Sequence, residues 1–322
     1  MKIITAIGMV LISSALGVAG RVAAQNNVGL DASPSRDAIV WQSPEQRQHP
    51  LLGQILRADG SAIDAATLFT LLAQADYVFV GEKHDNLDHH QLEKILLQAR
   101  LKARPDSAVV FEMLDDTQTA AITTLTAKDT LENIKTKLHW PEKGWDFVTY
   151  GPLFQLSLQK GKLVPGNLSK AFIGQLYMEG ESLLKKDPRF QTHSMASETT
   201  RQHLLDRLVE AHCGMQSREG LKPMLTIQLA KDASMANALT AYSSGLLVAG
   251  GEHSRADTGV PVHVLHRKNT ASTFVLQLVE VNAKDTQLAA YVESQGMADA
   301  YWFTPANSAK DYCADVKGKA AK

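Results

Sequence analysis

The chain has 322 residues, of which 44% are hydrophobic and 21% are charged, and its formal net charge is −1. This composition is typical of a globular protein with a sizeable core. The nearly balanced charge gives no reason to expect nucleic acid or an anionic membrane surface as a partner, because both select basic proteins.

The amino terminus has the pattern of an export signal. Lys2 is followed by an apolar stretch over 3–16, and Val22-Ala23-Ala24 fits the small-x-small cleavage rule. We expect cleavage near Ala24 and a periplasmic or secreted protein. The stretch is too short for a membrane span, and no other segment is apolar enough for one. Residues 25–48 are polar and expected to be flexible, so the main domain is expected over 49–322.

Short apolar runs alternate with helical patterns along the main domain. Helices are expected over 62–75 and 88–102, and Leu and Met residues at helical spacing without a strand pattern predict a smaller helical subdomain inserted at about 175–240. A helical or coiled tail is expected after the last strand. This alternation predicts an α/β fold with a mostly parallel central sheet flanked by helices. The expected strands are 77–80, 108–111, 163–164, 246–249 and 274–279.

The most informative segment is 81–90, which holds three His and three carboxylates directly after the first expected strand. It lies between the carboxyl end of that strand and the amino end of a helix, where ligands bind in open α/β sheets. The alternative is a solvated loop that caps the helix, with Asp85, Asn86 or Asp88 as the N-cap.

Two other expected strands end in similar residues. The strand over 246–249 is followed by Gly250-Gly251-Glu252-His253, and the strand over 108–111 is followed by Glu112. If these strands are neighbours in one parallel sheet, their polar residues meet at one edge. The residues expected there are Glu82, His84, Glu112, Glu252 and His253.

These motifs resemble a known superfamily. Gly81-x-x-His84, Gly250-x-x-His253 and the strand-end Glu112 are similar to motifs of the superfamily that joins the Tiki proteases, TraB proteins, erythromycin esterases and ChaN haem-binding proteins. The fuller pattern is similar to ChaN and covers about 50–282. It includes 81–90, 110–114, 145–154, 211–214, 231–236 and 259–261.

The ChaN resemblance implies a haem-binding protein in iron acquisition, working with the haem-uptake machinery of the cell envelope. It also implies haem held between two subunits, and therefore a homodimer. ChaN proteins are often lipoproteins with a Cys just after the signal. The only cysteines here are Cys213 and Cys313, so we expect no lipid anchor.

Ferric haem needs an apolar slot and an axial ligand such as phenolate or imidazole. Tyr150 is our first choice because it follows Trp145 and Phe147 and precedes Gly151-Pro152, which predicts an aromatic loop. His89, on the buried stripe of the helix expected over 88–102, is the second choice, and His84 is a further candidate. Tyr150 could instead be a rim aromatic bonded to a backbone carbonyl. Candidates for lining the slot, each also explained as core filler, are Met178, Met215, Met224 and Met235.

A metal-dependent hydrolase is the alternative to a binding protein without enzymatic activity. The Tiki side of the superfamily suggests a divalent metal on His84, His253, Glu82 and Glu112, with Glu112 or Glu252 as general base. A third interpretation makes His84, Glu112 and His253 a buried hydrogen-bonded network without a ligand.

The two cysteines of an exported chain suggest one disulfide, which would join Cys213 to Cys313 near the carboxyl end. The alternatives are two free thiols or a metal site with His212.

Overall fold

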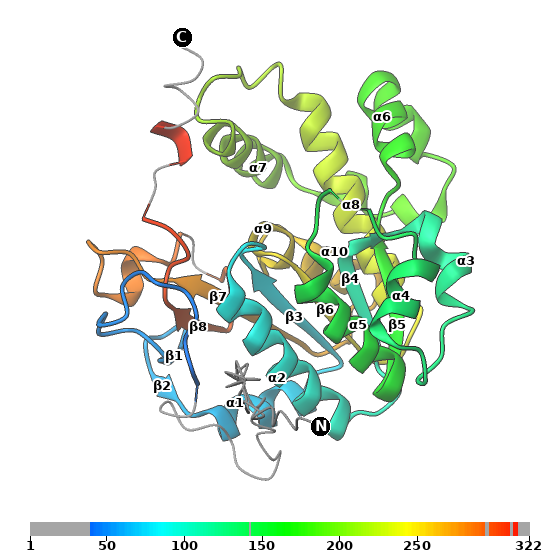
Figure 1. Ribbon diagram of the computed structural model, residues 1–322. Helices are drawn as coiled ribbons and strands as arrows, with labels where there is room; N and C mark the ends of the chain where they lie inside the picture. Colours follow the sequence, from blue (N-terminus) through cyan, green and yellow to red (C-terminus); the bar gives the residue numbers. More distant parts are fainter. Residues whose placement is uncertain (1–38, 142, 294–295, 310–311, 315–322) are drawn as a thin grey trace, which may run out of the picture. The chain divides into compact units, whose positions relative to one another are not determined.

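The computed structural model describes residues 39–141, 143–293, 296–309 and 312–314 (Figure 1). The expected signal peptide and its cleavage point near Ala24 lie outside these residues. The end of the segment expected to be flexible packs against the domain: the Ser43 amide donates to Asp88 at 2.8 Å, and Glu45 forms a β-bridge with Ala306. Within the described ranges, no helix has the length and apolar character needed to cross a membrane.

The core of the fold is an eight-stranded sheet with the order β2-β1-β8-β7-β3-β6-β4-β5. All strand pairs from β8 to β5 are parallel, whereas β1 pairs antiparallel with both β2 and β8. The predicted α/β fold with a mostly parallel sheet is therefore confirmed. The strands are β1 Ile55–Arg57, β2 Ala62–Ile63, β3 Tyr77–Glu82, β4 Ala108–Asp115, β5 Lys162–Asn167, β6 Gly245–Gly250, β7 Thr273–Glu280 and β8 Ala300–Thr304.

Helices cover both faces of the sheet because alternate residues of each strand point to opposite faces. Val78 and Val80 of β3 pack against α1, α2 and α5, while Tyr77 and Phe79 pack on the side of α8 and α10. The α-helices are α1 Ala65–Gln74, α2 Leu87–Ala103, α3 Thr119–Ile122, α4 Leu131–Lys137, α5 Phe147–Lys160, α6 Lys170–Glu179, α7 Glu198–Ala211, α8 Lys222–Thr240, α9 Gly251–Ser254 and α10 Val260–Arg267. The 3₁₀ helices are η2 Asp116–Gln118, η3 Gly180–Leu184, η4 Pro188–Phe190, η5 His193–Met195 and η6 Leu288–Ala290.

The structure differs from the sequence prediction at the antiparallel end of the sheet. The tail was predicted to be helical or coiled, but it returns as β8 between β7 and β1. Its run Tyr301-Trp302-Phe303 is fully buried there, which gives these large side chains a place in the core. The helix expected from residue 62 begins at Ala65, because the Asp64 side chain caps it by accepting from the Thr67 amide.

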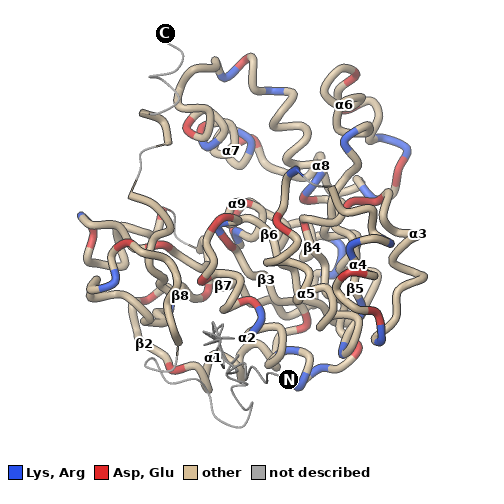
Figure 2. The backbone as a smooth tube through the Cα atoms, viewed as in Figure 1, with Lys and Arg blue, Asp and Glu red and all other residues tan. Residues whose placement is uncertain are grey.

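Between β5 and β6 the described elements are all helical, from α6 through η3, η4 and η5 to α7 and α8. Helix α8 packs on β4, β5 and β6. Cys213, which follows α7, is paired with Cys313 in a disulfide, with their Cα atoms 5.3 Å apart. Lys and Arg are interspersed with Asp and Glu along the chain, in agreement with the near-neutral net charge (Figure 2).

Candidate functional site

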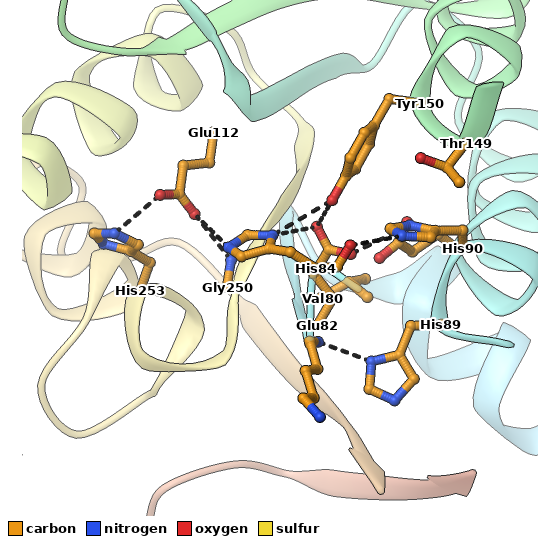
Figure 3. Close-up of polar contacts among 12 residues, drawn as sticks. Val80, Glu82, His84, His89, His90, Glu112, Thr149, Tyr150, Gly250 and His253 are labelled. Carbon is orange, nitrogen blue, oxygen red and sulfur yellow. Dashed lines mark hydrogen bonds and ion pairs between the residues drawn. The ribbon is translucent and has the colours of Figure 1, made fainter. Parts of the chain in front are cut away.

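The carboxyl ends of β3, β6 and β4 meet at one edge of the sheet because the three strands are adjacent and parallel. Glu82 at the end of β3 lies in register with Gly250 at the end of β6. Glu112 reaches the same edge from β4, and His253 reaches it from α9 directly after β6. The predicted meeting of strand-end residues therefore takes place, and we call Glu82, His84, Glu112, Tyr150 and His253 the strand-end network (Figure 3).

Glu112 is the centre of one half of this network. Its Oε1 accepts from Lys231 Nζ at 2.9 Å and lies 3.3 Å from His253 Nε2. Its Oε2 accepts from the Gly250 amide at 3.0 Å and lies 3.6 Å from His84 Nε2. Burial opposes the charge of Glu112, but His253 and Lys231 hold its pKa well below the usual value. Glu112 is therefore a buried, ionised carboxylate surrounded by donors.

His253 is held between two carboxylates. Its Nδ1 lies 2.6 Å from Asp232 Oδ1 on α8, and its Nε2 faces Glu112. Burial alone would lower the pKa of His253, but the charges of Glu112 and Asp232 raise it to about 9. At neutral pH this imidazole is therefore a cation that ties α9 to α8 and β4.

Glu82 is the centre of the other half. Its Oε1 accepts from the Tyr150 hydroxyl at 2.9 Å and lies 3.0 Å from His84 Nδ1 (Figure 3). The His84 ring packs against Trp145 with ring centroids 4.4 Å apart. Tyr150 was predicted to lie on a loop, and this is wrong: it lies in α5 with 1% of its surface exposed. Burial, followed by the charge of Glu82, raises the pKa of Tyr150 strongly, so its phenolate form is disfavoured here.

His90 and Glu93 extend this half along α2. His90 Nε2 lies 3.0 Å from the His84 carbonyl oxygen, to which it donates. His90 Nδ1 faces Glu93 Oε2 at 3.1 Å and Glu82 Oε2 at 3.3 Å. Burial raises the pKa of Glu93 to about 7, and burial together with the like charge of Glu93 raises that of Glu82 to about 7.

Two predicted site residues lie apart from these contacts. His89 is fully buried, with its Nδ1 accepting from the Lys83 amide at 2.8 Å and its Nε2 2.9 Å from Thr304 Oγ1. Burial holds the pKa of His89 well below its usual value. Glu252 turns away from the network and accepts from Arg207 on α7 at 2.7 and 3.0 Å.

The segment 81–90 also caps a helix, as its alternative interpretation proposed, but Asn86 and Asp88 are buried and not solvated. Asn86 is the N-cap of α2 and accepts from the amides of Asp88 and His89. Asp88 instead accepts from the Gln42 and Ser43 amides. The loop therefore both caps a helix and supplies the network.

Four network partners were not among the predicted site residues: His90 and Glu93 on α2, and Lys231 and Asp232 on α8. The prediction considered mainly residues that follow strands, whereas these four come from helices that pack on the sheet. A signal was available, because Lys231-Asp232 interrupts the apolar middle of α8 and His90 and Glu93 are three apart, on one side of a helix.

A different part of the chain offers an exposed phenol. Tyr177 on α6 is 48% exposed and Met178 beside it is 80% exposed. A Cβ built on Gly174, one turn earlier, meets no atom within 4 Å. We call Ile173, Gly174, Tyr177 and Met178 the α6 face, because residues three and four apart lie together on a helix. Of the other Met candidates, Met215 is 50% exposed and Met235 is fully buried.

Comparison with known proteins agrees with this fold. Residues 68–264 match the family described as "Haem-binding uptake, Tiki superfamily, ChaN". A solved structure described as "Cofacial heme binding to ChaN of Campylobacter jejuni" is 22% identical, has a TM-score of 0.62, and matches over 77% of this chain and 95% of its own.

A weaker structural match is the type III effector HopBA1, at 11% identity and a TM-score of 0.40 over 83% of this chain and 98% of its own. No curated protein matches the sequence. Because the family match spans more than half of the residues, the chain belongs to the ChaN family of the Tiki superfamily, the haem-binding uptake proteins.

Proposed function

We propose that this protein binds ferric haem at the α6 face and acts in haem and iron acquisition, with Tyr177 as the axial ligand. The observation that carries the proposal is an exposed phenol on an apolar helix face. Phenolate is a protein ligand of haem iron. The family supports haem as the bound group.

The α6 face offers exposed apolar side chains and an open backbone position to a flat, apolar macrocycle. Gly174 leaves the helix surface open at the position one turn before Tyr177. Met178 and the partly buried Ile173 supply apolar contacts on either side. Exposed apolar groups that cluster on one helix face mark binding surfaces.

The three ligands predicted from the sequence are less available. The Tyr150 hydroxyl is bonded to Glu82, and both ring nitrogens of His89 have partners. His84 faces carboxylates with both nitrogens but has 30% of its side chain exposed, which makes it our second choice. Iron at any of the three would have to replace an existing partner.

A homodimer is the second part of the proposal. Haem bound on an exposed helix face keeps its outer side open, and a second copy of the chain carrying its own haem could cover that side. The solved structure of Campylobacter jejuni ChaN is described as showing cofacial haem binding, which supports such an arrangement here. Export through the amino-terminal signal would place the protein in the periplasm or outside the cell, where it would exchange haem with the uptake machinery of the envelope.

Metal-dependent hydrolysis at His84, Glu112 and His253 is less well supported. Lys231 Nζ and the Gly250 amide already donate to the two oxygens of Glu112. A divalent cation at that carboxylate would compete with Lys231 and with the imidazolium of His253. We therefore propose a binding protein and no hydrolytic step.

The test compares two identical substitutions, Tyr177→Phe and Tyr150→Phe, by titrating purified protein with ferric haem. Wild type should give a saturable Soret shift that survives gel filtration, a phenolate-to-iron charge-transfer band, and a doubled mass by light scattering. Tyr177→Phe should lose the band and at least about tenfold in affinity, which is about 1.4 kcal/mol. Tyr150→Phe should keep both.

Other results of the haem titration would overturn either the ligand assignment or the proposed function. Loss of the band in Tyr150→Phe alone would assign the ligand to Tyr150 and overturn the assignment to Tyr177. If both variants keep the band, His84→Ala is the next variant to titrate. Failure of wild type to retain haem on gel filtration would overturn the proposed function itself.

A further inference from the structure

One buried cluster has no part in haem binding at α6: Glu82 of β3 with His90 and Glu93 of α2. These residues are 4%, 7% and 1% exposed. One donor atom from each lies within 4.8 Å of the other two. We call them the Glu82–His90–Glu93 triad, and Figure 3 shows the imidazole of His90 facing the carboxylate of Glu82.

The hydrogen bonds of His90 fix which nitrogen faces the carboxylates. Nε2 must carry a proton because it lies 3.0 Å from the His84 carbonyl, which can only accept. In the neutral imidazole, Nδ1 is then an unprotonated lone pair pointing at Glu82 and Glu93. A ring N–H donated to a backbone carbonyl is the usual way in which proteins orient a metal-binding histidine.

The separations of the donor atoms match a shared cation. His90 Nδ1 lies 3.1 Å from Glu93 Oε2 and 3.3 Å from Glu82 Oε2. Ligands about 2.1 Å from a metal lie about 3.0 Å apart at octahedral angles and about 3.4 Å apart at tetrahedral angles. Both separations from His90 fall in the range for ligands of one ion, and all three donor atoms lie within 4.8 Å of one another.

The triad also contains acceptors without donors. Glu82 Oε2 and Glu93 Oε1 are buried and have no hydrogen-bond partner among the described residues, and Glu82 Oε2 has only the ion-pair contact with His90 Nδ1 at 3.3 Å. Buried carboxylate oxygens are normally satisfied, so an unpartnered pair indicates a group that balances them. That group is either a proton shared among His90 Nδ1 and the two carboxylates or a bound cation.

We propose that the Glu82–His90–Glu93 triad binds one divalent transition-metal ion. One imidazole and two carboxylates are a donor set suited to Mn²⁺, Fe²⁺ or Zn²⁺. Tyr150 and His84 hold the other oxygen of Glu82 and orient it, as groups around a metal site commonly do. The site is separate from α6 and does not depend on haem.

The test uses haem-free, chelator-treated protein titrated with Mn²⁺ and with Zn²⁺ by calorimetry, followed by metal analysis after gel filtration. Wild type should bind one ion per chain, and its melting temperature should rise with metal. Glu93→Gln keeps the side-chain volume but removes the charge and one ligand oxygen, so the affinity should fall at least about tenfold. His90→Gln should behave alike.

Glu280→Gln is the matched control. Glu280 is a carboxylate paired with Lys83 and Asn86, outside the triad, so this variant should bind metal as wild type does. Absence of bound metal on wild type would overturn the proposal in favour of a shared proton, and undiminished binding in folded Glu93→Gln would overturn it by placing the metal outside the triad. Because haem is absent, neither outcome bears on haem binding.

Discussion

The strand-end network and the α6 face differ in how their chemical groups are occupied. Glu112 and Tyr150 of the network are 4% and 1% exposed, and each is bonded to other network members or to backbone. Tyr177 and Met178 of the α6 face are 48% and 80% exposed. The network is mostly buried and paired, apart from Glu82 Oε2, which faces the triad without a hydrogen bond, whereas the α6 face is open.

This difference separates holding the fold from binding a ligand. The network joins elements distant in sequence: Tyr150 comes from α5, Lys231 and Asp232 come from α8, and all meet the ends of β3, β4 and β6. Buried hydrogen-bonded networks of this kind rigidify a core. The comparison therefore predicts that changes in the network mainly affect folding stability, and that changes on α6 mainly affect haem.

The largest effect is expected for Glu112→Gln. The substitution leaves Lys231 and the imidazolium of His253 without their buried carboxylate, and breaking one partner of a buried ion pair costs about 3–5 kcal/mol. Urea unfolding should show this loss.

The matched control is Glu252→Gln, since this carboxylate pairs with Arg207 at a site where 39% of its side chain is exposed. Pairs of that kind contribute about 1 kcal/mol or less. Equal losses in the two variants would contradict the assignment of a buried charge centre.

A buried histidine outside the network gives the next prediction. His263 in α10 is 2% exposed, and its Nδ1 lies 2.9 Å from Thr192 Oγ1. Burial, followed by the charges of His266 and Arg267, lowers the pKa of His263 to about 3. The folded protein therefore binds fewer protons than the unfolded chain between pH 3 and 6.5. The contribution of neutral His263 to the free energy of unfolding is complete above pH 6.5 and is lost as the pH falls.

From pH 7 to pH 5 the loss from His263 should be about 2 kcal/mol. The measurement is the difference in unfolding free energy between wild type and His263→Gln across this range. The variant, which cannot titrate here, should depend less steeply on pH by that amount. Parallel curves for the two proteins would refute the low pKa of His263.

Much of the sheet and its polar edge could be predicted because the signal is local. The runs at 77–80, 108–111 and 246–249 are short and wholly apolar, as strands buried on both faces must be. Once such strands are parallel neighbours, the residues that follow them must share an edge. Glu82, His84, Glu112 and His253 met for this reason, and only Glu252 turned away.

What could not be predicted depends on packing between distant segments. Gly151-Pro152 indicated a loop at Tyr150, but α5 continues through Pro152. Burial of Tyr150 and Phe154, four residues apart on one side of this helix, outweighs the local preference. The exposure of Tyr177, our proposed ligand, was not predicted for the opposite reason: beside the apolar residues of a helical segment it resembles core, and sequence does not show which helix face stays uncovered.

The smallest expected effect is a gain in stability. It is tested by making the same Gly→Ala substitution in the strand-end network and on the α6 face. At Gly250, a Cβ would lie 2.9 Å from His84 Nε2, so Gly250→Ala must displace a ring held by Glu82 and Trp145. Such overpacking costs roughly 1–3 kcal/mol. Gly250→Ala therefore serves as the control for Gly174→Ala, because it adds the same methyl group at a crowded position.

Gly174→Ala should stabilise the haem-free protein by about 0.5–1 kcal/mol, because Gly in a helix interior is less favourable than Ala by this amount. The gain requires open space, and a Cβ at Gly174 meets no atom within 4 Å. If the α6 face were covered in solution by another part of the chain or by a second haem-free copy, the added methyl group would clash and the gain would disappear. Thermal unfolding of Gly174→Ala and Gly250→Ala without haem therefore measures whether α6 is open before the ligand arrives, and a destabilised Gly174→Ala would refute it.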